Sequence, residues 1–89
     1  MDEELNVKIE LDFKDIKNKK MLHEYLRVQL GLPDYYGNNL DALHDCLEAC
    51  GNIFSIRIYH FSDLKEEVGE YAEILLQVFK DIDLEYEIV

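Results

Sequence analysis

Four side chains that could do acid–base or metal chemistry recur along one short stretch of this sequence. They are Asp41, His44, Asp45 and Glu48, in the pattern Asp-x-x-His-Asp-x-x-Glu. At about 100° per residue, this spacing places all four on one side of a helix. Such a stripe has three possible uses: a solvated outer surface, a metal or catalytic site, and a protein-recognition surface.

A solvated outer surface is the usual role of a charged helix face. In a helix that surface charges stabilise, residues four positions apart usually carry opposite charges. Asp41 and Asp45 instead repel each other at that spacing. Glu48 would also lie at the negative C-terminal end of the helix dipole. A stripe that opposes the local stability of its helix suggests a function.

A metal or catalytic site is less well supported, although the residue types are those of metal ligands. All four residues come from one helix, whereas metal sites draw ligands from facing elements and carboxylate catalysis needs a cleft. The other histidines, His23 and His60, stand singly in a predicted helix and at a predicted strand end. They are typical of surface or packing residues. We therefore predict no metal, no cofactor, no catalytic residue and no enzymatic activity.

The charge of the chain favours a protein-recognition surface. Its 89 residues include 20 Asp or Glu and nine Lys or Arg, giving a net charge of −11. This balance argues against nucleic acid or an anionic membrane as partner and favours a basic protein, although solubility alone could also explain it. No Lys or Arg lies between Val28 and Ile56, so the stripe has no neutralising base near it in the sequence.

Aromatic anchors commonly accompany the charges of such a surface. Tyr35 and Tyr36 stand at the entry to the acidic helix and could supply them. Tyrosines at a turn can also cover the core, and we expect at least one of the two to do so.

Three short segments alternate apolar and polar residues, at positions 7–12, 54–59 and 84–88. Alternation with period two predicts strands with one buried face. Helical patterns separate the segments, so the strands should be parallel, with right-handed crossovers. We predict one α/β domain over residues 1–89, in which a three-stranded parallel sheet of order 1-2-3 carries all the helices on one face.

Capping signals mark two of the predicted helices, and apolar spacing marks a third. Asn18 can cap a first helix, which Gly31 ends. A short helix starts at Ser62-Asp63 and ends near Gly69, and a longer helix spans about residues 70–81.

The acidic helix follows a turn over residues 34–37, which comes after the only proline, Pro33. Asn38 or Asn39 can cap this helix and Gly51 can stop it. The other side of the helix is apolar and should dock on the core through Leu40, Leu43, Cys46, Leu47 and Cys50.

The stretch LPDYYGNNLDALHDCL, residues 32–47, resembles the signature of the barstar family, intracellular inhibitors of barnase-type ribonucleases. LLQVFKD, residues 75–81, is a second resemblance, and the order of elements agrees over essentially the whole chain. The resemblance implies a three-stranded parallel sheet covered by helices on one face, which is the fold predicted above from alternation.

The resemblance also implies a binding site. Such inhibitors fill the nuclease active site, which basic side chains line to hold RNA phosphates. Asp45 matches the family carboxylate that occupies a phosphate position, and Asp41 matches a second carboxylate on the same face. Matching contacts from the turn, the helix start and the long helix are Tyr35, Gly37, Asn39 and Asp81. We add three positions where this sequence differs from the best-known member: His44, Glu48 and Ala49.

We therefore expect an intracellular inhibitor of a basic, extracellular-type ribonuclease like barnase, or of a related nuclease toxin. It should form a 1:1 complex and be a monomer when free. The alternative is an interaction module that keeps this fold and binds another basic partner or itself. The start MDEELN lacks the basic and apolar segments of a signal peptide, and no apolar run approaches the about 20 residues that span a bilayer. We therefore expect the cytoplasm as its location.

Overall fold

Strands and helices alternate along the chain in the computed structural model, which describes residues 7–50 and 54–89. The strands are β1 (Val7–Asp12), β2 (Phe54–Tyr59) and β3 (Tyr86–Ile88). The helices are α1 (Lys19–Leu30), α2 (Leu40–Cys50), α3 (Phe61–Val68) and α4 (Glu70–Asp81). None of the helices in these ranges has both the length and the apolar character needed to cross a membrane.

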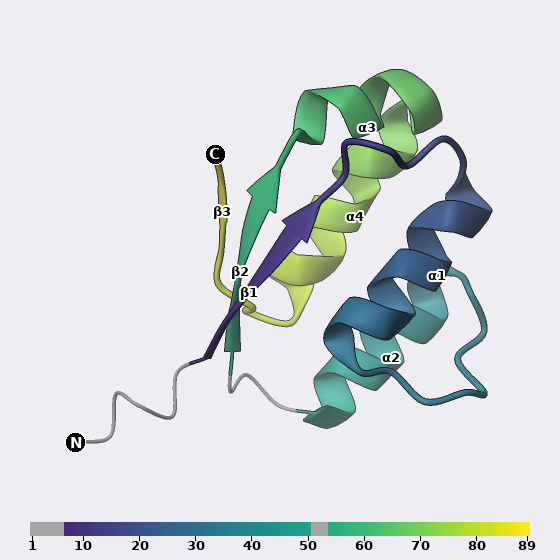
Figure 1. Cartoon of the computed structure of the whole chain (residues 1–89). Helices are drawn as coiled ribbons and strands as arrows, with labels where there is room; N and C mark the ends of the chain where they lie inside the picture. The colour runs from purple at the N-terminus through teal and green to yellow at the C-terminus, as the bar shows by residue number, and fades with distance from the viewer. Residues whose placement is uncertain (1–6, 51–53) are drawn as a thin grey trace.

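The strands form one parallel sheet in the order β1-β2-β3. β1 pairs with β2 in a register that sets Ile9 opposite Ile56, and β2 pairs with β3 with Ile56 opposite Tyr86. Each crossover between neighbouring strands contains two helices, and Figure 1 shows α1, α2 and α4 on the same side of the sheet. The predicted α/β fold and strand order are therefore confirmed.

The hydrophobic core lies between this sheet and the helices. The predicted alternation turns Leu11, Ile56 and Ile58 into it, and all three are at most 1% exposed. Helices contribute most of the other large buried side chains, among them Leu22, Leu26, Leu43, Leu47, Leu64, Leu75 and Phe79, and the loop after β1 contributes Phe13. Val7 begins the first predicted strand on its apolar face, but its side chain is outside the part of the chain that the structure describes.

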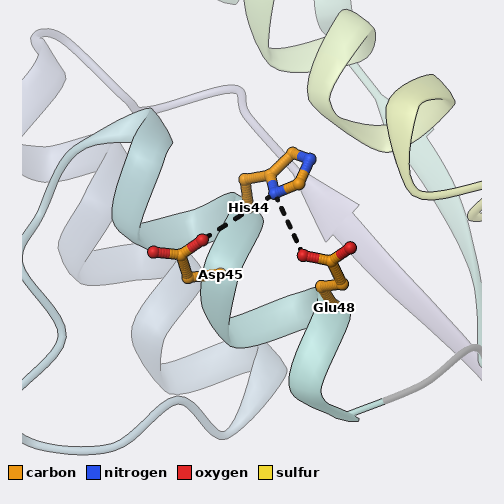
Figure 2. A group of neighbouring side chains, drawn as sticks. All are labelled: His44, Asp45 and Glu48. Atoms are coloured by element: carbon orange, nitrogen blue, oxygen red, sulfur yellow. Dashed lines mark ion pairs between the residues drawn. The ribbon is translucent and has the colours of Figure 1, made fainter.

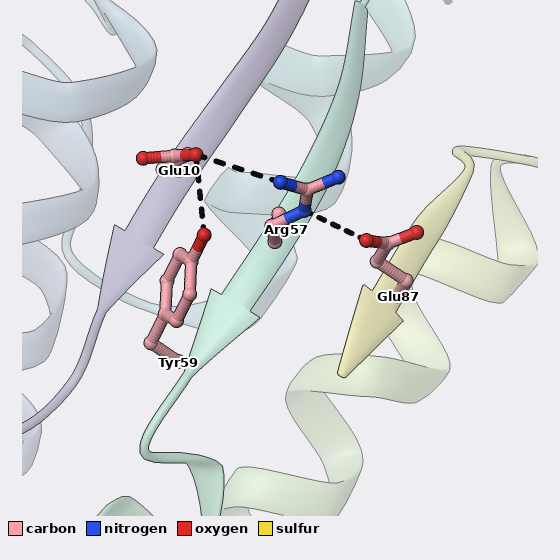
Figure 3. Close-up of polar contacts among 4 residues, drawn as sticks. All are labelled: Glu10, Arg57, Tyr59 and Glu87. Carbon is pink, nitrogen blue, oxygen red and sulfur yellow. Dashed lines mark hydrogen bonds and ion pairs between the residues drawn. The ribbon is translucent and has the colours of Figure 1, made fainter. Parts of the chain in front are cut away.

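The outward face of the sheet is polar, and ion pairs cross its three strands (Figure 3). Arg57 on the central strand donates from Nε to Glu87 Oε2 at 2.7 Å, and its Nη1 lies 3.8 Å from Glu10 Oε2. The Tyr59 hydroxyl donates to the same Glu10 oxygen at 3.2 Å. Two residues depart from the alternation: Ser55 is buried on this outward face, and Ile88 of β3, opposite the buried Ile58, is 47% exposed.

Two predicted boundaries were wrong. α3 begins at Phe61 rather than at Ser62-Asp63, because His60 occupies the capping position with a φ of 61°. The His60 imidazole is exposed, and its hydrogen bond to Asp12 at 2.8 Å lowers the pKa of that carboxyl. β3 begins at Tyr86 rather than at Leu84, which lies buried just before the strand.

α1 has the predicted caps, and they determine where the chain turns toward α2. Asn18 Oδ1 accepts from the Met21 N–H at 2.8 Å. Gly31 takes a φ of 68°, in the left-handed region that glycine adopts without strain, and the Leu32 N–H then bonds to the Arg27 carbonyl at 2.9 Å. The chain leaves α1 at this point and enters the turn that leads to α2.

Candidate protein-binding site

α2 begins at a cap made by Asn39. The Asn39 Oδ1 accepts from the Ala42 N–H at 2.8 Å, and the Asn39 Nδ2 donates to the Gly37 carbonyl at 3.2 Å. Asn39 is therefore bonded to both the turn and the helix. The other predicted cap, Asn38, instead adopts a φ of 55° within the turn.

The apolar side of α2 docks on the core, as predicted. Leu43 and Leu47 are at most 1% exposed, and Leu40 and Cys46 are half-buried against the same core. The side chain of Cys50 and the predicted stop at Gly51 lie outside the described residues. α2 also packs against α4. The helix is therefore held both by the core and by α4.

The opposite side of α2 carries three exposed carboxylates, Asp41, Asp45 and Glu48. We call these three residues the acidic face. The side chains of Asp45 and Glu48 are 85% and 67% exposed. Within the described residues, the ion pairs of these carboxylates come from His44 alone. The exposed Ala49 follows in the last turn of the helix.

His44 departs from its predicted position among the outward carboxylates. Its side chain is only 33% exposed, with Nδ1 lying 3.7 Å from Glu48 Oε1 and 4.0 Å from Asp45 Oδ1 (Figure 2). At about 100° per residue, His44 lies about 60° from the buried Leu47, whereas Asp45 lies about 160° from it. His44 therefore occupies the border between the docked side and the acidic face.

His44, Asp45 and Glu48 each offer one metal-ligand atom, and these atoms lie within 4.8 Å of one another. The predicted stripe member Asp41 does not join them. In the described ranges, no histidine, cysteine or carboxylate of a facing element completes the group. That this chain binds no metal stays a prediction.

The two tyrosines of the turn point in different directions. Tyr35 is 87% exposed, whereas Tyr36 is 6% exposed and belongs to the core, which confirms that one of them covers the core. Arg27 lies beside the same turn, with its Nη1 3.5 Å from Asp34 Oδ1. Arg27, the last basic residue before α2 in the sequence, is thus paired with a carboxylate outside the acidic face.

The remaining predicted contacts lie at the ends of elements. Gly37 is in the turn, where an added Cβ would meet Ala42 Cβ and Asn39 Nδ2 at 3.4 Å, close to van der Waals contact. Asp81 is exposed at the end of α4 and accepts from Gln77 Nε2 at 3.0 Å. Asp81 therefore belongs to a helix that packs against α2 and not to the acidic face itself.

The sequence patterns did not identify His23 as the residue that supports the turn from the core side. His23, predicted as an ordinary surface or packing residue, is 1% exposed and hydrogen-bonded through both ring nitrogens. Its position three residues before Leu26, which is fully buried, placed it near the core face of α1. No local pattern identifies its partners, because they come from distant parts of the chain.

The arrangement suits recognition of a basic surface. Ionised carboxylates accept paired, charge-assisted hydrogen bonds from arginine as phosphate oxygens do. The acidic face holds three of them on a helix whose start is capped and whose other side is docked. Their high exposure makes them available to a partner.

Comparison with known proteins agrees with these features. The family model described as "Barstar (barnase inhibitor)" matches residues 6–88. A protein of Bacillus subtilis (strain 168) named "Putative ribonuclease inhibitor YrdF" is 37% identical over 75 residues, which cover 83% of this chain and 82% of that protein. Both descriptions name inhibitors, which confirms the prediction that this chain is not an enzyme. Because the family model matches almost the whole length, this chain belongs to the barstar family of barnase inhibitors.

Proposed function

We propose that this chain inhibits a basic, barnase-like ribonuclease by placing the acidic face in the nuclease active site. One observation carries the proposal: three exposed carboxylates on a docked helix, with no lysine or arginine of the described residues paired to them. Family membership and the name of the B. subtilis relative support the same function.

Phosphate mimicry is the proposed mechanism. A ribonuclease holds the RNA backbone with basic side chains, and these bind a carboxylate through the same charge-assisted hydrogen bonds. A carboxylate on a protein helix offers no phosphodiester bond to cleave. Asp45 is the central contact, Asp41 and Glu48 lie along the same helix, and Tyr35 supplies an exposed aromatic anchor beside them.

We propose a 1:1 complex, because one copy of the chain carries one acidic face. The same proposal has the chain acting in the cytoplasm, where a nuclease that reaches cellular RNA has to be blocked, and existing as a monomer before it meets its target. The net charge of −11 increases the rate at which a basic target is captured.

The proposal is tested with Asp45→Ala and a matched control, Asp34→Ala. Both residues are exposed aspartates, but Asp34 lies in the turn and pairs with Arg27. Inhibition constants are measured against a panel of barnase-like ribonucleases. Truncating one partner of a buried interfacial charge pair costs about 2–5 kcal/mol, or roughly 30-fold to several-thousand-fold in affinity. This general range includes measurements on the barnase–barstar pair itself.

We expect Asp45→Ala to lose inhibition by at least about 30-fold and Asp34→Ala to lose less than about threefold. Equal effects of the two variants would contradict the assignment of Asp45. If the unmodified chain inhibits no member of the panel and instead binds another basic protein or itself through α2, the interaction-module alternative replaces this function.

A further inference from the structure

A buried polar cluster lies behind the turn that leads into α2. His23 of α1 is 1% exposed, its Nδ1 lies 2.6 Å from the Tyr36 hydroxyl, and its Nε2 lies 2.6 Å from the Tyr71 hydroxyl. Tyr36 belongs to the turn and Tyr71 belongs to α4. One imidazole therefore joins two helices to the segment that determines where the acidic face begins.

One arrangement of protons satisfies every group of this cluster. The Tyr36 hydroxyl donates to the Asn39 carbonyl at 3.4 Å, so its oxygen accepts from the Nδ1–H of His23. The unprotonated Nε2 then accepts from the Tyr71 hydroxyl. Among the described residues, no buried side-chain nitrogen or oxygen lacks a partner. The series of hydrogen bonds ends at Asn39, the residue whose side chain caps α2.

The surroundings keep the cluster neutral. Burial lowers the pKa of His23 and raises the pKa of Tyr36 and of Tyr71. Lys19 lies at the edge of the cluster, with its Nζ over the Tyr71 ring at 4.5 Å from the centroid. A neutral imidazole donates at one nitrogen and accepts at the other, which is what a bridge between two hydroxyl groups requires.

We propose that His23 is a positioning residue for the acidic face. Through Tyr36 it holds the turn against α1 and α4, and it thereby fixes the point and the direction in which α2 starts. A face that is already ordered loses less conformational entropy when a partner binds. Binding therefore depends on the Nδ1–Tyr36 contact beyond any effect on stability. The binding part of this proposal rests on the proposed function.

Two substitutions of His23 separate positioning from stability. An asparagine amide reaches the position of Nδ1, and a glutamine amide reaches the position of Nε2. His23→Asn thus keeps the bond to Tyr36 and loses Tyr71, whereas His23→Gln does the reverse. Tyr36→Phe and Tyr71→Phe each cut one of these bonds from the other side and keep the aromatic ring, so they serve if a His23 variant fails to fold. Tyr36→Phe also loses the bond to the Asn39 carbonyl.

We expect His23→Gln and Tyr36→Phe to raise the dissociation constant for an inhibited nuclease by about tenfold. His23→Asn and Tyr71→Phe should raise it by less than about threefold, although all four variants lower the thermal midpoint. If affinity falls in proportion to stability whichever bond is cut, the positioning role is overturned.

A second measurement needs no nuclease. The amides of Ala42 and Leu43 bond to the side chain and the carbonyl of Asn39, so their hydrogen exchange reports on the start of α2. We expect exchange about tenfold faster in His23→Gln than in His23→Asn, because both variants keep the Tyr36 hydroxyl and only His23→Gln cuts its bond to residue 23. If the chain inhibits no nuclease but this difference is present, the proposed function fails and the positioning role stands. Equal exchange in the two variants would contradict the positioning role whatever the chain binds.

Discussion

Asp45 and His44 are neighbours in sequence but have different surroundings in the folded chain. The Asp45 side chain is 85% exposed, whereas that of His44 is 33% exposed and lies between two carboxylates of its own helix. Asp45 is therefore available to a partner. His44 is the one basic side chain paired with the acidic face among the described residues.

At the scale of single residues, His23 also predicts a pH dependence of stability. Burial lowers the pKa of His23 below its ordinary value of 6.5. Above that pH the histidine is neutral in both the folded and the unfolded chain, so its contribution to stability is fully present. Below it, the unfolded chain takes up a proton that the folded chain does not, and the free energy of unfolding falls by up to about 1.4 kcal/mol per pH unit.

This contribution is measured by urea unfolding of the unmodified chain and of His23→Asn between pH 7.5 and pH 5. The variant removes the ionisation of residue 23 and its bond to Tyr71. The lost bond lowers the free energy of unfolding by an amount that does not change with pH over this range, so a change with pH reports the ionisation. The difference in unfolding free energy between the two proteins should shrink as the pH falls below about 6.5. A difference that stays constant over this range would show that His23 does not titrate differently in the folded chain.

At the scale of elements, the start of α2 is the feature on which the acidic face depends. Asn39 caps the helix and holds the turn through two side-chain hydrogen bonds. Asn39→Ala should lower the unfolding free energy by about 1 kcal/mol, the usual cost of losing such a cap. Thermal or denaturant unfolding measures the loss.

Asn38→Gly is the matched control for the cap. Asn38 adopts a φ of 55°, a conformation that glycine adopts without strain. This variant should therefore change stability by less than about 0.5 kcal/mol. If the two asparagines prove equally important, the cap lies elsewhere than the structure indicates.

Local signals in the sequence were sufficient for most of the fold. The Asn18 and Gly31 caps bounded α1, and the apolar spacing gave α4 over residues 70–81. Period-two alternation gave the strands, and the helical segments between them gave the parallel sheet. Each of these signals acts within a few residues of chain. The start of α3 was missed because His60 adopts a left-handed conformation that is uncommon for a residue with a side chain.

Tertiary contacts explain what the sequence did not predict about the site. The border position of His44 depends on how far α2 is rotated on the core, which the pattern of leucines gives only approximately. The bridge at His23 joins residues 13 and 48 positions away in the sequence. Its geometry exists only after α1, the turn and α4 have packed together.

At the scale of the whole molecule, cations and anions are distributed unevenly. Arg27, Arg57 and Lys17 pair with carboxylates of the turn, the sheet and α3, respectively. The acidic face receives no such pairing from a lysine or arginine in the described ranges. A basic protein that approaches this side therefore meets carboxylates that no lysine or arginine of the described residues neutralises.

This distribution predicts how salt affects association. Added salt screens the attraction between exposed charges, so the association rate with an inhibited nuclease should fall by about tenfold or more between low and high ionic strength. Stopped-flow mixing compares Glu48→Gln with Glu66→Gln, which change the net charge equally but lie on α2 and α3. Glu48→Gln should reduce the salt dependence of the association rate more than Glu66→Gln does. Equal reductions would show that the attraction depends on net charge alone.

Competition with an active-site ligand tests phosphate mimicry most directly. A nuclease that this chain inhibits is first incubated with a non-cleavable nucleotide phosphate at a series of saturating concentrations. Binding of this chain is then measured by calorimetry at each concentration. If the acidic face occupies the phosphate positions, the apparent dissociation constant should rise in proportion to the nucleotide added, and no ternary complex should form. An affinity that is independent of nucleotide would show that the chain binds outside the active site and would contradict phosphate mimicry.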